Sequence, residues 1–221
     1  MTDTMNNAAK DGLRFFGRMS AAISHDLKNT LSIMNESAGL IEDLALLTEK
    51  GRPLDPQRIH QLGATIKRQI QRNDGIVRNM NQFAHSVDNP LKEISLASSL
   101  EMLLSICRRL TDARGIAVSV APPDREIAIV TRPFYLYHLV WRLLEWSLDY
   151  AGAGKRLVLQ IDPVPGAVRL VCRGLEGLTE TGAGQCPPSQ WHDLLVLLEG
   201  RIEVAADQQS VAAVLPQRID A

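Results

Sequence analysis

The sequence predicts an α+β protein, with an N-terminal antiparallel helical hairpin followed by a two-layer α/β sandwich. In residues 13–50 and 57–87, apolar side chains recur three and four positions apart and proline is absent. This spacing is typical of amphipathic helices. After Pro90, short alternating segments follow segments with helical spacing. Such a mixture indicates an open sheet with helices on one face. We therefore expect two domains, at residues 1–88 and 89–221.

Composition and charge argue against several classes of protein. The chain has 221 residues, 45% of them hydrophobic, and a net charge of −1. That balance gives no electrostatic reason to expect nucleic acid as a partner. No apolar run is long enough to form a membrane span, and the polar first dozen residues do not resemble a signal peptide. We expect a cytoplasmic protein with no membrane partner, no sensor domain ahead of the first helix, and no metal or cofactor of its own.

The hairpin is predicted from two apolar stripes and the break between them. Gly51–Pro56 interrupts the helical pattern, because proline blocks helix continuation. One hairpin alone leaves half of each stripe exposed, so we expect a homodimer in which two hairpins form a four-helix bundle. The first stripe comprises Phe16, Met19, Ile23, Leu27, Met34, Ile41 and Leu44. The second comprises Ile59, Leu62, Ile66, Ile70, Val77, Met80 and either Phe83 or Ala84.

The second domain is predicted to alternate strands and helices. Strands are expected near residues 92–96, 115–120, 126–130, 156–161 and 167–172. Helices are expected at 98–113, 133–150 and 189–198, and a final hairpin at 201–206 and 210–215. Gly200 suits the left-handed cap that often ends a helix.

The segment Ser24–Asn29 contains the most informative residues. Ile23 and Leu27 lie on the apolar stripe, so His25 between them is expected to face solvent. Asp26 and Asn29 are three positions apart and share a flank of the helix. An exposed imidazole is a nucleophile near neutral pH. A neighbouring carboxylate can keep one ring nitrogen protonated, which leaves the other free to attack phosphorus.

The remaining histidines lack such neighbours. His60 and His85 are expected to be exposed on the second helix, and His192 on the outer face of the last helix. His138, in a strongly apolar helix, is expected to be packed or to face the sheet. The three cysteines, Cys107, Cys172 and Cys186, share no metal or redox spacing.

The segment Ser24–Leu31 resembles the H-box of sensor histidine kinases. The resemblance implies that His25 is a phospho-acceptor, that Asp26 is its general base, and that Asn29 orients a water for dephosphorylating a response regulator. Later segments, Glu199–Val204 and Val214–Pro216, are similar to the end of the ATP-binding domain of that family. The resemblance thus extends over about residues 13–216.

Several positions depart from the family's nucleotide-binding motifs. Arg142–Ser147 stands where the family has its asparagine box, and Trp146 there offers no oxygen to Mg²⁺. Arg173–Gly177 stands where the family has an Asp-x-Gly-x-Gly motif, so Arg173 replaces the aspartate that recognises adenine and Leu175 stands at the first glycine. Gln185 and the two prolines after Cys186 replace a phosphate-binding glycine loop, and proline has no N–H to donate. About eight residues follow Gly177 before this point, too few for the usual lid, so we expect no ATP binding.

These observations favour a histidine phosphotransferase in a two-component phosphorelay, which passes a phosphoryl group between receiver domains through His25. The partners implied are response-regulator receivers, a second copy of this chain and possible hybrid histidine kinases, with Mg²⁺ supplied by the receiver. The alternatives are a non-catalytic pseudokinase adaptor, a phosphatase acting on a response regulator, and an active kinase with an unusual nucleotide site. Receiver docking is expected at Phe15, Phe16, Met19, Ala22 and Lys28.

Overall fold

The fold is that of a computed structural model, which describes residues 2–219. The chain forms two compact units. One comprises residues 19–82, and the other combines the segment up to Arg18 with the chain from Phe83 onward. These limits differ from the expected 1–88 and 89–221, because the first turns of the N-terminal helix pack with the C-terminal part of the chain. We call the units the hairpin unit and the α/β unit.

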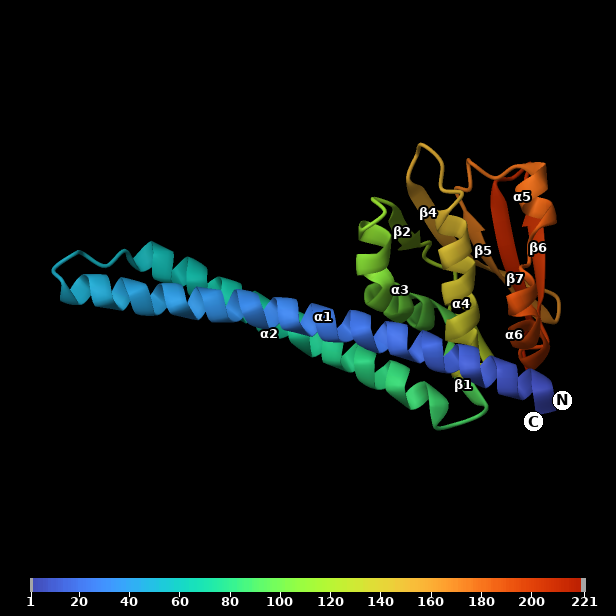
Figure 1. The fold of residues 1–221 in the computed structure, drawn as a ribbon, viewed down its shortest axis with the longest axis horizontal. Coiled ribbons are helices and arrows are strands. Elements are labelled where there is room, and N and C mark those ends of the chain that lie inside the picture. The colour runs from blue at the N-terminus through green and yellow to red at the C-terminus, as the bar shows by residue number, and fades with distance from the viewer. Residues whose placement is uncertain (1, 220–221) are drawn as a thin grey trace. The chain divides into compact units, whose positions relative to one another are not determined.

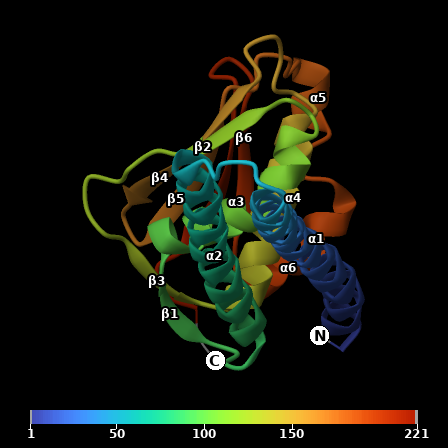
Figure 2. The same cartoon turned by 90° about the vertical axis from the view of Figure 1, so that its left-hand side faces the viewer.

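Two long helices form the predicted hairpin. Helix α1 spans Thr2–Glu49, so it begins well before the expected Leu13, and α2 spans Pro56–Ala84. They run antiparallel beside each other (Figures 1 and 2). Asp55 caps α2, because its Oδ1 accepts a hydrogen bond from the backbone N–H of Gln57 at 2.9 Å, and Pro56 suits the first helical position. A short 3₁₀ helix, η1, follows at His85–Val87.

The inner face of α2 differs from the predicted stripe. Ile70 and Val77 were expected on it, yet they are 47% and 40% exposed. Gln69 and Asn73 are half-buried instead, and the Asn73 side chain is hydrogen-bonded to Thr30, which is completely buried. The predicted stripe counted apolar residues only, so it left out these two polar positions. The exposure of Ile70 and Val77 agrees with the expectation that a single hairpin leaves half of each stripe exposed. Polar side chains can occupy inner positions when they find partners across the hairpin.

The α/β unit contains a five-stranded sheet of order β2-β4-β5-β7-β6, in which β2 and β4 are parallel and the other neighbours antiparallel. A separate antiparallel pair is formed by β1 and β3. The strands are β1 Lys92–Ser95, β2 Ala117–Val120, β3 Ala128–Thr131, β4 Arg156–Val164, β5 Ala167–Arg173, β6 Arg201–Ala205 and β7 Ser210–Pro216. The helices are α3 Leu96–Asp112, α4 Pro133–Leu148, α5 Glu180–Gly184, η2 Ser189–Trp191 and α6 His192–Leu197. All the expected elements are present, and α5 was not predicted.

The core of the α/β unit lies between one face of the sheet and helices α3, α4 and α6 (Figure 1). Along β4, Leu157, Leu159 and Ile161 are buried while the residues between them are only half-buried, as expected for a sheet covered on one face. Most of α4 is buried. The expected two-layer sandwich is therefore confirmed, and α4 also packs against the N-terminal turns of α1.

The turn between α6 and β6 corrects one expectation. The left-handed residue is Glu199, with φ of 50°, and not Gly200. Gly200 is required for space, because a Cβ there would lie 2.8 Å from Leu215 Cδ2 and 3.2 Å from the Val214 carbonyl oxygen. The glycine thus allows the turn to approach strand β7 closely.

Candidate functional site

His25 lies on α1 within the hairpin unit, and its side chain is 50% exposed. The neighbouring Ile23 is buried and Leu27 is half-buried, which confirms that His25 points to solvent. Its Nδ1 lies 3.6 Å from Oδ1 of Asp26, whose side chain is 21% exposed. The carboxylate therefore faces one ring nitrogen, and no described residue forms a hydrogen bond with the other, Nε2. Lys28 and Asn29 are exposed on the following turn.

The other histidines have different environments. His60 and His192 are exposed, as expected. His85 is exposed too, but its Nδ1 lies 2.6 Å from Oδ2 of Asp88, a pair that the sequence analysis missed although the two residues are three positions apart. Only His138 is buried.

The residues expected to dock a receiver do not form one exposed surface. Phe15 is 2% exposed and lies in an aromatic cluster of the α/β unit, with ring centroids 5.6 Å from Phe83, 5.7 Å from Phe134 and 4.7 Å from His138. Met19 and Ala22 are also buried, whereas Phe16 is half-buried and Lys28 is exposed. The expected docking role of Phe15 is therefore replaced by core packing. For Phe16 and Lys28 it stays a prediction.

A cluster of charged side chains joins the first turns of α1 to α4. Arg142 donates to both carboxylate oxygens of Asp11, each at 2.7 Å, and its other terminal nitrogen lies 3.3 Å from Glu145. Glu145 in turn accepts from Arg18 at 2.7 Å. Both hydrogen bonds to Asp11 come from the one nitrogen Nη2, and charge-assisted hydrogen bonds are shorter and stronger than those between neutral groups. Gly12 allows the helices to approach, because a Cβ there would lie 2.9 Å from the ring of Phe134.

His138 lies at the buried end of this cluster. Its ring stacks on Phe15 with 8° between the planes, and its Nε2 is 3.4 Å from Oδ2 of Asp11. Burial lowers the pKa of His138 to about 4, with Asp11 acting to raise it and Arg142 to lower it further. The ring is therefore neutral at neutral pH and serves packing, as the sequence indicated, but it packs against α1 and not against the sheet.

The titration of His138 gives a testable dependence of stability on pH. Its pKa is depressed in the folded state, so between about 6.5 and about 4 the unfolded chain binds more protons and the folded state loses stability as the pH falls. The free energy of unfolding should decrease by up to about 3 kcal/mol over this window. The measurement is urea unfolding from pH 7 to 4.5, followed by tryptophan fluorescence, compared with His138→Phe, which cannot titrate. Equal pH profiles of the two proteins would contradict the prediction.

The positions that the sequence analysis compared with nucleotide-binding motifs make contacts within the α/β unit. The Trp146 ring lies 4.5 Å from that of Tyr150, and Tyr150 also packs against Gly182 of α5, where a Cβ would lie 3.0 Å from the ring. Leu175, in the segment that begins at Arg173, is completely buried. The carboxylate of Glu176 accepts a hydrogen bond from the backbone N–H of Gly154 at 2.9 Å.

Two further positions in this region face away from the core. Arg173 donates from Nε to Gln160 Oε1 at 3.0 Å, on the outer face of the sheet. Gln185 is exposed at the end of α5. Helix α5 is capped by Thr179, whose hydroxyl oxygen accepts from the N–H of Gly182 at 3.2 Å. The stretch between Gly177 and Cys186 is thus a short capped helix.

Across residues 2–219, no group of three or more histidine, cysteine, aspartate or glutamate side chains is arranged to hold a metal ion. No helix in this part of the chain has the length and apolar character needed to cross a membrane.

None of the protein-family models matches the chain, and no curated protein matches it. Among solved structures, the chain is similar to the Acinetobacter baumannii histidine kinase AdeS, with 12% identity and a TM-score of 0.46 over 87% of this chain and 98% of that one. It is also similar to the catalytic domain of histidine kinase ThkA, with 11% identity and a TM-score of 0.48 over 59% of this chain and 99% of that one.

A third similar structure is the cytoplasmic segment of histidine kinase QseC, with 17% identity and a TM-score of 0.41 over 66% of this chain and 93% of that one. All three are histidine-kinase structures, the class that the H-box resemblance indicated. At these scores and identities, nothing about the chemistry of this chain follows from the likeness.

Proposed function

We propose that the chain is a histidine phosphotransferase of a two-component phosphorelay, and that it acts in the cytoplasm. The observation that carries this proposal is the local geometry of His25, an exposed imidazole with one nitrogen facing the Asp26 carboxylate at 3.6 Å and the other open to solvent. The imidazole of His25 is the nucleophile, and the carboxylate that can activate it is already adjacent. The remaining reactant is a phosphorylated partner protein.

The proposed reaction moves a phosphoryl group between protein side chains. The Nε2 lone pair of His25 attacks the phosphorus of an aspartyl phosphate, and the bond from phosphorus to the aspartyl oxygen breaks. The aspartate leaves as a carboxylate with that electron pair. The positive charge that develops on the ring, which keeps its proton on Nδ1, is stabilised by Asp26. Transfer to a second receiver reverses these steps, so that Nε2 recovers its electron pair. The receiver is proposed to supply the Mg²⁺ that neutralises the phosphoryl oxygens.

The proposal includes the absence of ATP-dependent autophosphorylation. Arg142, in place of a metal-binding asparagine, is already paired with Asp11 and Glu145. Leu175 is buried where the family has a glycine, and the Glu176 carboxylate is bonded to Gly154. These contacts support the proposal that side chains of the α/β unit pack against one another at the positions where the family binds nucleotide.

We therefore expect Mg²⁺-ATP at millimolar concentration to leave the melting temperature of the protein unchanged. A ligand at 100 times its dissociation constant stabilises the folded state by about 2.7 kcal/mol. Nucleotide binding of ordinary affinity would therefore raise the melting temperature measurably. The measurement is differential scanning fluorimetry with and without nucleotide, with Mg²⁺ alone as the control. A nucleotide-dependent rise of several degrees would favour the alternative of an active kinase.

We also propose that the chain forms a homodimer through its hairpin. Large apolar side chains remain exposed on the hairpin unit, and a second copy would bury them. They are Leu31, Leu46, Leu47, Leu54, Ile70 and Val77.

The dimer is tested by charge substitution on α2. Ile70→Lys combined with Val77→Lys is expected to give monomers in sedimentation velocity, because two charges on each chain would have to be buried in the interface. Gln71→Lys combined with Gln82→Lys adds the same charge at exposed polar positions of α2 and should leave the dimer intact. A double variant at Ile70 and Val77 that still sediments as a dimer would exclude this face.

The phosphotransfer proposal is tested with a separately phosphorylated receiver domain. Label should appear on the chain, and it should be acid-labile and base-stable, as expected for phosphohistidine. Receiver binding without label on the chain would favour a non-catalytic adaptor. Faster loss of phosphate from the receiver would favour a phosphatase, for which the exposed Asn29 is available one turn beyond His25.

A further inference from the structure

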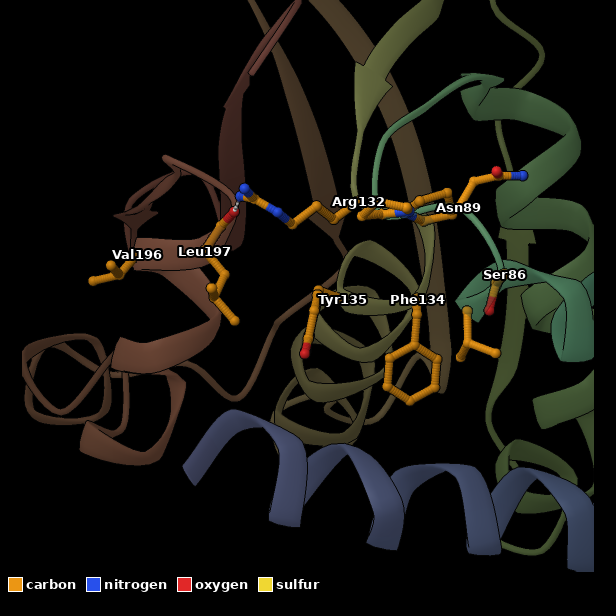
Figure 3. A pocket seen from close by; sticks show the side chains of 10 residues that line it. Ser86, Asn89, Arg132, Phe134, Tyr135, Val196 and Leu197 are labelled. Atoms are coloured by element: carbon orange, nitrogen blue, oxygen red, sulfur yellow. Dashed lines mark hydrogen bonds between the residues drawn. The ribbon is translucent and has the colours of Figure 1, made fainter. Parts of the chain in front are cut away.

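A cavity of about 430 Å³ opens on the α/β unit between η1, the first turn of α4 and the end of α6 (Figure 3). Such a volume is typical of small-ligand sites, which range from about 300 to 1,000 Å³. None of its lining residues belongs to the hairpin unit or to the segments that correspond to nucleotide-binding motifs. Its apolar lining consists of Val87, Pro90, Pro133, Phe134, Val196 and Leu197.

One charged side chain lies in this largely apolar cavity. Arg132, the residue that precedes α4, extends across it, and Nη1 donates to the backbone oxygen of Leu197 (Figure 3). A guanidinium has five N–H donors, so most of them remain available. Arg132 is half-buried, and it takes part in no ion pair with any residue in the described range 2–219. A partly desolvated charge beside apolar walls is costly unless an anion pairs with it.

Further polar groups of the lining can assist a ligand. Tyr135 and Asn89 are also among the lining residues, and within residues 2–219 neither side chain forms a hydrogen bond. The hydroxyl of Ser86 does not have its proton free for a ligand, because it donates to the backbone oxygen of Phe83 at 2.6 Å. The rim is apolar, since Val87 and Val196 are 55% and 51% exposed. The cavity thus offers unpaired donors and one positive charge inside an apolar opening.

We propose that this cavity binds a small amphipathic carboxylate. The carboxylate pairs with the free N–H groups of Arg132, and an apolar body of roughly eight carbons or more packs between Phe134, Val87 and Val196. A charge-assisted hydrogen bond to a guanidinium supplies the orientation, and burial of the hydrocarbon supplies most of the affinity. This binding site is separate from the proposed phosphotransfer through His25. It would give the α/β unit a small-molecule ligand although the unit is proposed not to bind ATP.

The test is calorimetric titration of the full chain with octanoate, and in parallel with 1-octanol, which has the same hydrocarbon chain without the charge. Octanoate is expected to bind saturably, one per chain, and about tenfold more tightly than octanol, because a hydrogen bond to a charged group is lost in the alcohol. Arg132→Gln should weaken octanoate about tenfold and leave octanol nearly unchanged. Equal affinities for both compounds, or no saturable binding of octanoate, would overturn the proposal.

Two further variants keep the result interpretable if Arg132→Gln unfolds. Val196→Asp, at an exposed rim position, should abolish octanoate binding, since it adds a repelling carboxylate beside the apolar wall. Arg125→Gln removes an exposed arginine outside the cavity lining and should bind octanoate as the native chain does. Octanoate binding that survives Val196→Asp, or that is lost equally in Arg125→Gln, would place the ligand elsewhere. Phosphotransfer is measured separately, so the two proposals can fail independently.

Discussion

A His25→Ala chain is expected to accept no phosphoryl group from a phosphorylated receiver. The substitution removes the proposed phospho-acceptor, and neither Asp26 nor Asn29 carries an imidazole nitrogen that could take its place. The loss of label should therefore be complete. The measurement is transfer of ³²P from an isolated receiver domain, resolved by gel electrophoresis at short times. Since His25 is half-exposed, its removal should leave the melting temperature almost unchanged.

Two further variants serve as comparisons for the His25→Ala chain. His60→Ala removes an exposed histidine from the other helix of the hairpin and should transfer at the native rate. Asp26→Asn keeps the shape of the carboxylate but not its charge. It should slow transfer by about 10²–10³, the usual cost of removing one group that stabilises charge in the transition state. Label that persists on His25→Ala would mean that another residue is the acceptor, and the assignment of His25 would then be wrong.

Truncation of Phe15 to alanine is expected to destabilise the α/β unit by about 3–5 kcal/mol, the usual cost of removing a buried phenylalanine. Phe15 is 2% exposed, and it contacts the rings of Phe83, Phe134 and His138. Its loss leaves a cavity between α1 and α4. Urea unfolding followed by tryptophan fluorescence measures the effect, because all three tryptophans lie in the α/β unit.

The matched control is Leu13→Ala, two positions earlier on the same helix. Leu13 is 73% exposed, so its truncation should change the free energy of unfolding by less than about 0.5 kcal/mol. A Phe15→Ala chain with native stability and weakened receiver binding would restore the docking role that the sequence indicated for Phe15. It would also show that the first turns of α1 do not pack as the structure has them.

Much of the fold could be predicted because its signals are local. The helical period over residues 13–50, the proline break at residues 53–56 and the alternation along β4 are each visible within a short window of sequence. The same holds for His25, whose exposure follows from the burial of Ile23 and the partial burial of Leu27 on the same helix. Properties set by neighbours within one or two helical turns can be derived from spacing alone.

The contacts between distant parts of the chain could not be derived in this way. Asp11 and Arg142 pair across 131 positions, and neither residue carries a local sign of the other. The same applies to Phe15 against His138, and to Thr30 with Asn73. An apolar stripe shows which side of a helix is buried, but not what covers it. Burial of a polar or charged side chain depends on a partner supplied by another element, and only the folded chain brings that partner within reach.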